Sequence, residues 1–184
     1  MSPTQSSGEK AGGAIVWFTG LPSSGKSRLA NRVQGRLAGE CRPCCLLDGD
    51  RVRSLLHPTP GYSDLERNDF YRTLGDLALE LAGQGLIVLV AATANRRQYR
   101  DQVRARAPHF IEVFMTASLE ECRRRDAKLL YAQFAGGKVQ GLPGEDSSYE
   151  APESAEVTAN GGDDQAGLEQ VVESLQAPRA APRA

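Results

Sequence analysis

One segment near the amino terminus combines glycines, a lysine and a serine at the spacing of a phosphate-binding loop. It matches the pattern G-x-x-x-x-G-K-[ST] and reads Gly20, Leu21, Pro22, Ser23, Ser24, Gly25, Lys26, Ser27. Glycines let backbone N–H groups approach phosphate oxygens. The lysine reaches the β- and γ-phosphates, and the serine hydroxyl ligates Mg²⁺. The pattern predicts a nucleoside triphosphate site with Lys26 active in phosphoryl transfer. The alternative is a glycine-rich turn beside a solvated lysine.

Two carboxylates follow a second strand-like segment, residues 44–47, at its carboxyl end. They are Asp48 and Asp50, and in open α/β sheets ligands bind at this edge. One carboxylate can orient Mg²⁺ through water while the other accepts the proton of an attacking hydroxyl. The alternative is that Asp48 or Asp50 only caps the next helix. The spacing leaves both interpretations open.

Basic and aromatic residues come next along the chain. Arg53 and Arg67 flank a Pro/Gly loop that carries Tyr62. Two guanidinium groups beside a ring suit an anionic nucleotide, through bidentate hydrogen bonds and stacking. The alternative is a pair of exposed arginines on helix faces. The run 123–125, three arginines, is typical of a solvated helix face.

Strand-like and helix-like segments alternate around these residues. Short apolar runs predict strands at 14–19, 44–47, 86–92, 111–115 and 156–159. Helical periodicity predicts helices near 27–39, 64–83 and 96–106, after Ser118, and over 168–175. In the second helix, the buried stripe is expected to comprise Phe70, Leu74, Leu77 and Leu81. Alternation of this kind predicts a three-layer α/β sandwich with a mostly parallel sheet of about five strands, of the P-loop kinase type.

The length of 184 residues suits one domain. We expect disordered tails at 1–12 and 176–184 around a domain over 13–175. Residues 127–154 hold six glycines or prolines with little periodicity. A loop of that length inside a compact domain is usually functional, so we predict that it forms a lid over the binding site.

The composition argues against several classes of binding partner. The net charge of −1 gives no overall field to recruit nucleic acid or an anionic membrane. The longest apolar run, 86–92, is far shorter than the roughly 20 residues of a membrane span, so we expect a cytoplasmic protein. The four cysteines and the histidines His57 and His109 lack metal-site spacing, and both histidines are expected at the surface.

Seven blocks of the chain resemble the adenylylsulfate kinases in order and spacing. They are GLPSSGKS, LLDGDRVR, GYSDLER, GLIVLVA, FIEVFM, RDAKLLY and DSSYEAPE, within about residues 13–160. The resemblance implies phosphorylation of the 3′-hydroxyl of adenylylsulfate by Mg-ATP, giving 3′-phosphoadenylylsulfate. It also implies a homodimer and places ATP phosphates on residues 20–27. Asp50 falls at the carboxylate for the metal and the acceptor hydroxyl, with Asp48 beside it.

The resemblance also assigns the acceptor side and the lid. Arg53 and Arg67 match arginines that hold the phosphosulfate end of the acceptor, and Tyr62 matches a ring stacked on its adenine. Arg125 and Lys128 belong to the lid segment near both nucleotides. Leu142 takes the place of a lid phenylalanine that covers the adenine.

Several positions differ from the usual family pattern, all on the acceptor side. They are Arg51 for Asn, Asp69 for Glu, Phe70 for Asn, Leu142 for Phe, and residues 92–97, which keep only Arg97. A kinase of the same build with another nucleotide-linked or small anionic acceptor is therefore an alternative, and a non-catalytic nucleotide-binding relative is a second. Phe70 either packs in the core, as its spacing from Leu74 favours, or offers a ring to the pocket.

Overall fold

The computed structural model describes residues 13–126 and 128–176. It contains a five-stranded sheet in the order β2-β3-β1-β4-β5, and every strand pairing is parallel. The strands are β1 (Ala14–Thr19), β2 (Cys44–Asp48), β3 (Ile87–Ala91), β4 (Phe110–Met115) and β5 (Val157–Ala159). The predicted fold class is confirmed. The expected tails lie outside the described residues, except for Gln176.

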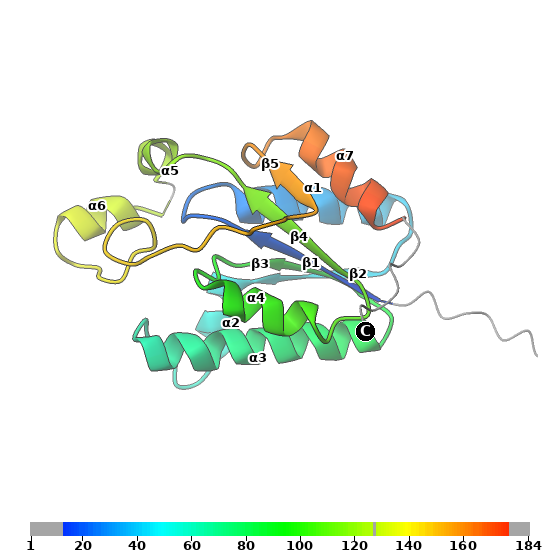
Figure 1. Cartoon of the computed structure of the whole chain (residues 1–184), viewed down its shortest axis with the longest axis horizontal. Helices are drawn as coiled ribbons and strands as arrows, with labels where there is room; N and C mark the ends of the chain where they lie inside the picture. Colours follow the sequence, from blue (N-terminus) through cyan, green and yellow to red (C-terminus); the bar gives the residue numbers. More distant parts are fainter. Residues whose placement is uncertain (1–12, 127, 177–184) are drawn as a thin grey trace, which may run out of the picture.

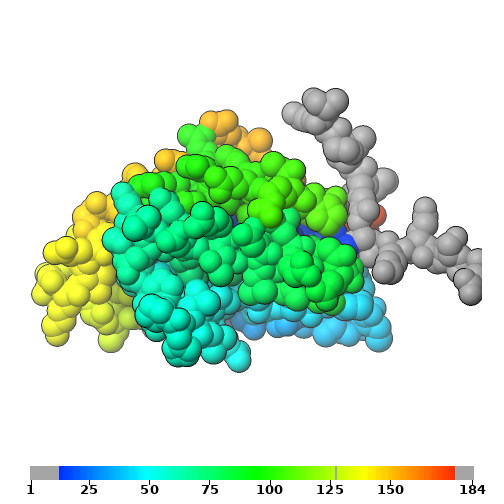
Figure 2. Space-filling model, turned by 90° about the horizontal axis from the view of Figure 1, so that it is seen from below, coloured from blue at the N-terminus to red at the C-terminus, as the bar shows by residue number. Residues whose placement is uncertain are grey.

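Helices cover both faces of this sheet (Figure 1). The helices are α1 (Lys26–Gly39), α2 (Gly49–Leu55), α3 (Asp64–Gly83), α4 (Arg97–Arg104), α5 (Leu119–Arg125), α6 (Leu130–Ala135) and α7 (Gln165–Ser174). One core cluster joins α1 and α7 to one face, and a second joins α3 and α4 to the other. Helices α5 and α6 lie beyond the carboxyl ends of the strands (Figure 1). Figure 2, seen from the α3 side, shows the lid segment projecting at that end.

One strand is less buried than its neighbours, and one local expectation needs correction. Strand β2 is half-buried throughout because it is an edge strand that pairs only with β3. In α3, Phe70 and Leu74 are buried as predicted, whereas Leu77 is 39% exposed. The buried face also includes Gly75, Ala78 and Ala82, small residues that the spacing of the large apolar side chains did not indicate.

The lid is more ordered than its composition predicts. Within 127–154, residues Leu130–Ala135 form α6, and an isolated bridge joins Pro143 to Ser147. Asp126 accepts the backbone N–H groups of Tyr131 at 3.1 Å and Ala132 at 3.0 Å, and so satisfies the free amino end of α6. The six-residue helix is too short to show helical periodicity in the sequence.

Other local expectations can be checked directly. Helix α5 begins after Ser118 as predicted, and Ser118 caps it in a capping box with Glu121. His57 is exposed, as expected, whereas His109 is half-buried. Within the described part of the chain, no helix has the length and apolar character of a membrane span.

Candidate active site

The glycine-rich loop joins β1 to α1 and needs its glycines for steric reasons. Gly20 and Gly25 have φ values of 145° and 102°, which L side chains rarely adopt. A Cβ on Gly20 would lie 2.8 Å from the Cβ of Met115. A Cβ on Gly25 would collide with the backbone of Gly162. The backbone of this loop can therefore approach a ligand closely.

Lys26 lies at the first position of α1 with its ammonium folded over the loop. Its Nζ donates to the carbonyl oxygens of Gly20 at 3.0 Å and Leu21 at 2.7 Å. Burial lowers the pKa of Lys26 to about 8, although the negative charge of Asp50 opposes the shift. The hydroxyls of Ser23 and Ser24 are buried and have no hydrogen-bond partner among the described residues. Lys26 and Ser23 line the cavity, and their donors fit phosphate oxygens, because buried polar groups otherwise require partners.

The two carboxylates at the carboxyl end of β2 make different contacts. Asp48 caps α2 by accepting the backbone N–H of Asp50 at 3.0 Å and of Arg51 at 3.3 Å. Asp48 also accepts the hydroxyl of Ser27, so it is both a cap and a neighbour of the predicted metal ligand. Asp50 is exposed and forms an ion pair with Lys128 of the lid. Burial lowers the pKa of Lys128, but the hydrogen bond and charge of Asp50 outweigh it and the net pKa is raised.

Arg53 and Arg67 are only 7% and 5% exposed, so the exposed-arginine interpretation is wrong. Arg53 Nη1 donates to the carbonyl oxygens of Pro60 at 3.1 Å and Gly61 at 2.6 Å. Both arginines thus hold the 60–62 loop, since Arg67 Nε donates to the Tyr62 carbonyl at 2.8 Å.

Arg67 also reaches the lid. Its Nη2 donates to the carbonyl of Gly141, 74 residues away in sequence. This contact joins α3 to the lid. Sequence reasoning missed it because nothing local in the chain pairs these two positions.

The predicted acceptor-side apolar residues occupy different settings. Tyr62 is 56% exposed, and its ring centroid lies 4.5 Å from the guanidinium carbon of Arg53 and 5.5 Å from that of Arg67. Leu142 is buried in a small cluster with Tyr131 and Cys122. Phe70 is in the core cluster beneath α3 and also lines the pocket. The favoured core interpretation of Phe70 is confirmed, but it describes only one side of the ring.

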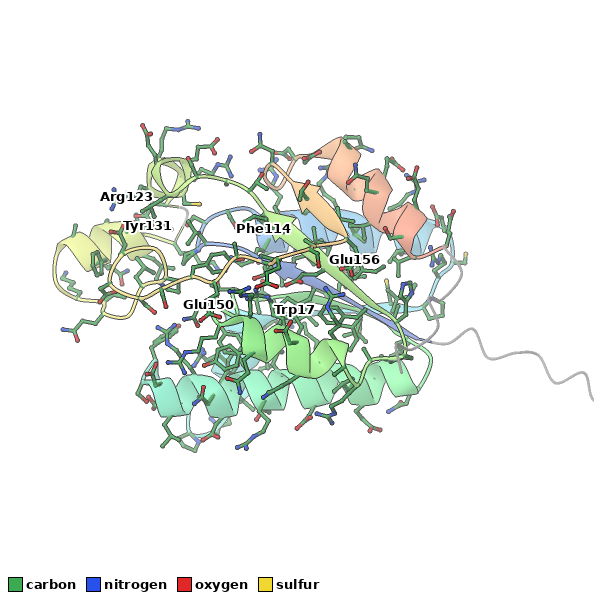
Figure 3. The ribbon with its side chains drawn as sticks, viewed as in Figure 1. Trp17, Phe114, Arg123, Tyr131, Glu150 and Glu156 are labelled. Atoms are coloured by element: carbon green, nitrogen blue, oxygen red, sulfur yellow. The ribbon has the colours of Figure 1, made fainter. Side chains whose placement is uncertain are left out.

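The arginine run at the end of α5 is not uniformly solvated. Arg125 Nη1 donates to the Ser24 carbonyl at 3.3 Å, so its guanidinium lies against the glycine-rich loop. Arg123 forms two hydrogen bonds of 2.6 Å to the carboxylate of Glu145. Arg124 is exposed. Tyr131 of α6 donates to the Pro22 carbonyl at 3.0 Å, and Figure 3 shows it beside Arg123 at this end of the molecule.

One cavity of about 1030 Å³ connects these groups. Lys26 and Ser27 line it on the side of the glycine-rich loop, and Arg53 and Arg67 line it on the opposite side, with Asp50 also in the wall. The lid contributes residues 138–143, and the loop after β5 contributes 160–163. Typical small-molecule pockets measure roughly 300–1,000 Å³, so this cavity lies at the upper end of that range.

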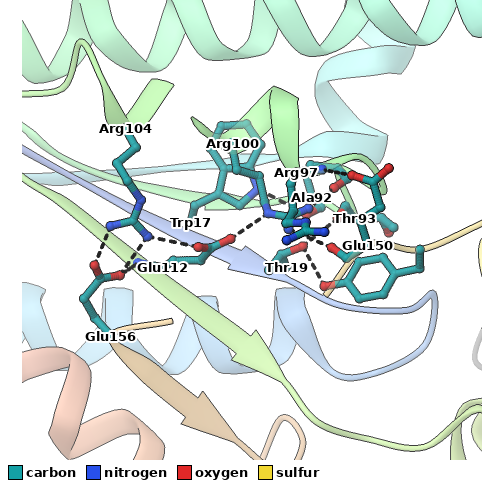
Figure 4. Close-up of polar contacts among 12 residues, drawn as sticks. Trp17, Thr19, Ala92, Thr93, Arg97, Arg100, Arg104, Glu112, Glu150 and Glu156 are labelled. Carbon is teal, nitrogen blue, oxygen red and sulfur yellow. Dashed lines mark hydrogen bonds and ion pairs between the residues drawn. The ribbon is translucent and has the colours of Figure 1, made fainter. Parts of the chain in front are cut away.

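A buried polar network anchors the carboxyl end of the lid to the sheet (Figure 4). Arg100, 1% exposed, donates to Glu112 at 2.6 Å and to the Glu150 carbonyl at 2.8 Å. Tyr149 lies 3.0 Å from the hydroxyl of Thr19, the last residue of β1. The one sequence signal was Glu112, a charged residue within an apolar strand that requires a buried partner.

Comparisons with known proteins agree with this geometry. Residues 12–160 match the family model described as adenylylsulphate kinase. An adenylyl-sulfate kinase from Picosynechococcus is 38% identical, with 89% of this chain and 90% of the relative covered. A bifunctional enzyme NodQ from Azospirillum brasilense is 44% identical over 78% of this chain, which spans only 24% of that enzyme.

Solved structures give the same result. The chain superposes on the Mycobacterium tuberculosis APS kinase CysC, in complex with AMPPNP and APS, with a TM-score of 0.83 and 34% identity. The match covers 90% of this chain and 98% of the other. At this identity and coverage, the likeness extends beyond the general fold.

Proposed function

The chain belongs to the adenylylsulfate kinase family, and we propose on this basis that it transfers the γ-phosphoryl group of ATP to the 3′-hydroxyl of adenylylsulfate. The products are ADP and 3′-phosphoadenylylsulfate. The observation that carries the proposal is the single cavity lined by Lys26 and Ser27 on one side and by two buried arginines on the other. A donor and an anionic acceptor fit this arrangement together.

On the donor side, the glycine-rich loop binds the phosphates of ATP. The backbone N–H groups of the loop and the hydroxyl of Ser23 donate to phosphate oxygens, and the positive end of α1 points at the same anion. Lys26 exchanges its two carbonyl partners for the β- and γ-phosphates. Arg125, held against the loop by the Ser24 carbonyl, borders the donor site.

The donor set suits Mg²⁺. Mg²⁺ prefers oxygen ligands and keeps several waters, so one or two protein groups suffice beside substrate phosphates. Ser27 and Asp48 supply adjoining oxygens, and Asp50 adds an exposed carboxylate. Among the described residues, no three His, Cys, Asp or Glu gather as metal ligands. Mg²⁺ would therefore be held by Ser27, with Asp48 and Asp50 acting through water, and would neutralise charge on the phosphates.

On the acceptor side, Arg53 and Arg67 bind the phosphosulfate and Tyr62 stacks on the adenine. Asp50 orients the 3′-hydroxyl and accepts its proton. Lys128 forms an ion pair with Asp50 and so lies beside the proposed position of the acceptor hydroxyl. Because phosphoryl transfer passes through a loose transition state, catalysis depends on this positioning and on charge stabilisation.

The lid completes the site in this proposal. Residues 128–154 carry Lys128, the Gly141 contact of Arg67 and Leu142, so closure excludes water and limits hydrolysis of ATP. A homodimer and a cytoplasmic location stay predictions, as do the domain limits 13–175.

Turnover measured with a panel of acceptors tests the proposal. With Mg-ATP, the wild type should form ADP fastest with adenylylsulfate, and AMP, ADP and small sugar acids should be poor acceptors. Lys26→Ala should abolish turnover and leave the fold intact, with a somewhat lower melting temperature because two hydrogen bonds to carbonyl oxygens of the loop are lost. A faster reaction with another acceptor would favour the alternative kinase, which the differences at Phe70 and Leu142 leave open.

A further inference from the structure

A buried ring lies directly against one of the acceptor-side arginines. The guanidinium carbon of Arg53 is 3.8 Å from the ring centroid of Phe70, closer than to Tyr62 at 4.5 Å. Phe70 is 3% exposed, so this contact is largely removed from water. A desolvated guanidinium over an aromatic face is held more strongly than an exposed one.

Phe70 is itself fixed by neighbouring rings. Its ring meets that of Tyr71 edge-on at 5.3 Å between centroids, and Tyr71 stacks on Tyr99 at 4.6 Å. The hydroxyl of Tyr71 accepts the backbone N–H of Ala94 at 3.0 Å. The surface against which Arg53 lies is therefore rigid.

The hydrogen bonds of Arg53 leave part of its guanidinium available to a ligand. Both bonds to the 60–61 backbone are made by Nη1. No described residue accepts from its Nε or Nη2, neither atom is among the buried groups that lack a partner, and Arg53 lines the cavity. The ring face and the two carbonyls thus set the plane of the guanidinium and direct its remaining donors.

We propose that Phe70 is a positioning residue that holds the Arg53 guanidinium in the plane required by the anionic end of the acceptor. The inference rests on the proposed function, because it assigns the acceptor to Arg53. Phe70 acts through Arg53 and not on ATP, which the opposite side of the cavity binds. A purely structural role for Phe70 would instead affect stability and both substrates alike.

Steady-state kinetics of Phe70→Leu separates these roles. Leucine keeps an apolar side chain beneath α3 but removes the ring face. We expect KM for adenylylsulfate to rise by about 5- to 30-fold, equivalent to about 1–2 kcal/mol. The values of kcat and of KM for ATP should stay within about twofold of wild type. Phe70→Met, which fills the same space flexibly, replaces Phe70→Leu if that variant melts too early to assay.

Leu74→Ala is the matched control. Leu74 lies one turn further along α3, is fully buried and is absent from the cavity wall. This variant should lower the melting temperature at least as much as Phe70→Leu and leave KM for adenylylsulfate unchanged.

A double-mutant cycle with Arg53→Ala tests whether Phe70 acts through Arg53. In the Arg53→Ala background, Phe70→Leu should change kcat/KM for adenylylsulfate by less than about twofold. Additive effects, or an unchanged acceptor KM in Phe70→Leu, would overturn the inference while leaving the proposed function intact. Absence of adenylylsulfate turnover by the wild type would overturn the proposed function, and this inference with it.

Discussion

Replacing Arg67 by alanine should weaken both the fold and acceptor binding. The change removes two charge-assisted hydrogen bonds, to the carbonyls of Tyr62 and Gly141, from a side chain that is 5% exposed. Such bonds contribute about 1.5–3 kcal/mol each. Because they share one donor group and are not additive, we expect a loss near 3 kcal/mol. At about 2–4 °C per kcal/mol for a protein of this size, the melting temperature should fall by about 6–12 °C.

The effect on the acceptor is measured separately. Titration of adenylylsulfate at saturating ATP should show KM raised by about 10- to 150-fold, from the same 1.5–3 kcal/mol per lost bond. Arg72→Ala is the control, since Arg72 is on the same helix, is 70% exposed, and among the described residues pairs only with Asp69. It should change unfolding by under about 0.5 kcal/mol. If Arg67→Ala melts and binds acceptor like Arg72→Ala, the reasoning about buried arginines is refuted.

Three further changes test other parts of the account. Asp50→Asn keeps the shape of the side chain but removes its charge, so kcat should fall by roughly 10²-fold. The melting temperature should change little, because the ion pair of Asp50 is exposed. A kcat within a few-fold of wild type would contradict this role. Glu112→Gln leaves the buried Arg100 without its anion, so chemical denaturation should show a loss of about 3–5 kcal/mol in the free energy of unfolding. The control Asp76→Asn, at an exposed ion pair, should cost under about 0.5 kcal/mol. Similar losses in the two variants would contradict a stabilising role for the buried network. Asp164 caps α7, and the N–H groups of Gly167 and Asn160 lower its pKa from the ordinary value of 3.8. Asp164→Ala should therefore lower the free energy of unfolding by about 1–2 kcal/mol at pH 7. Because folding stabilises the charged form, the difference in free energy of unfolding between wild type and variant should be fully present above pH 3.8. It should shrink as the pH falls through the lowered pKa. A difference that stays constant down to pH 2 would exclude the carboxylate charge as its source.

Features encoded in contiguous residues could be predicted from the sequence. The glycine-rich loop, Lys26 and Ser27 lie within one eight-residue motif, and the strand before it and helix after it follow from local periodicity. Alternation of strands and helices then fixed a parallel sheet. The carboxylates could be placed at its edge for the same reason.

Features that depend on which faces pack could not be predicted. From the sequence, Arg53 and Arg67 could be either exposed arginines or ligands of an anionic nucleotide. The structure shows both buried and hydrogen-bonded to backbone carbonyls. The Lys128–Asp50 ion pair spans 78 residues and the Arg67–Gly141 bond spans 74, so no local pattern encodes either. Phe70 was predicted to face either the core or the pocket, but its ring contacts both.

The position of the transferred phosphoryl group tests the central claim most directly. The purified protein is incubated with Mg²⁺, adenylylsulfate and ATP labelled with ¹⁸O on the γ-phosphate. The labelled product is isolated and examined by ³¹P NMR. We predict one labelled phosphate ester on the 3′-oxygen of adenylylsulfate, formed by the wild type and absent with Lys26→Ala. Label found only in free phosphate, or on another position or acceptor, would contradict the account.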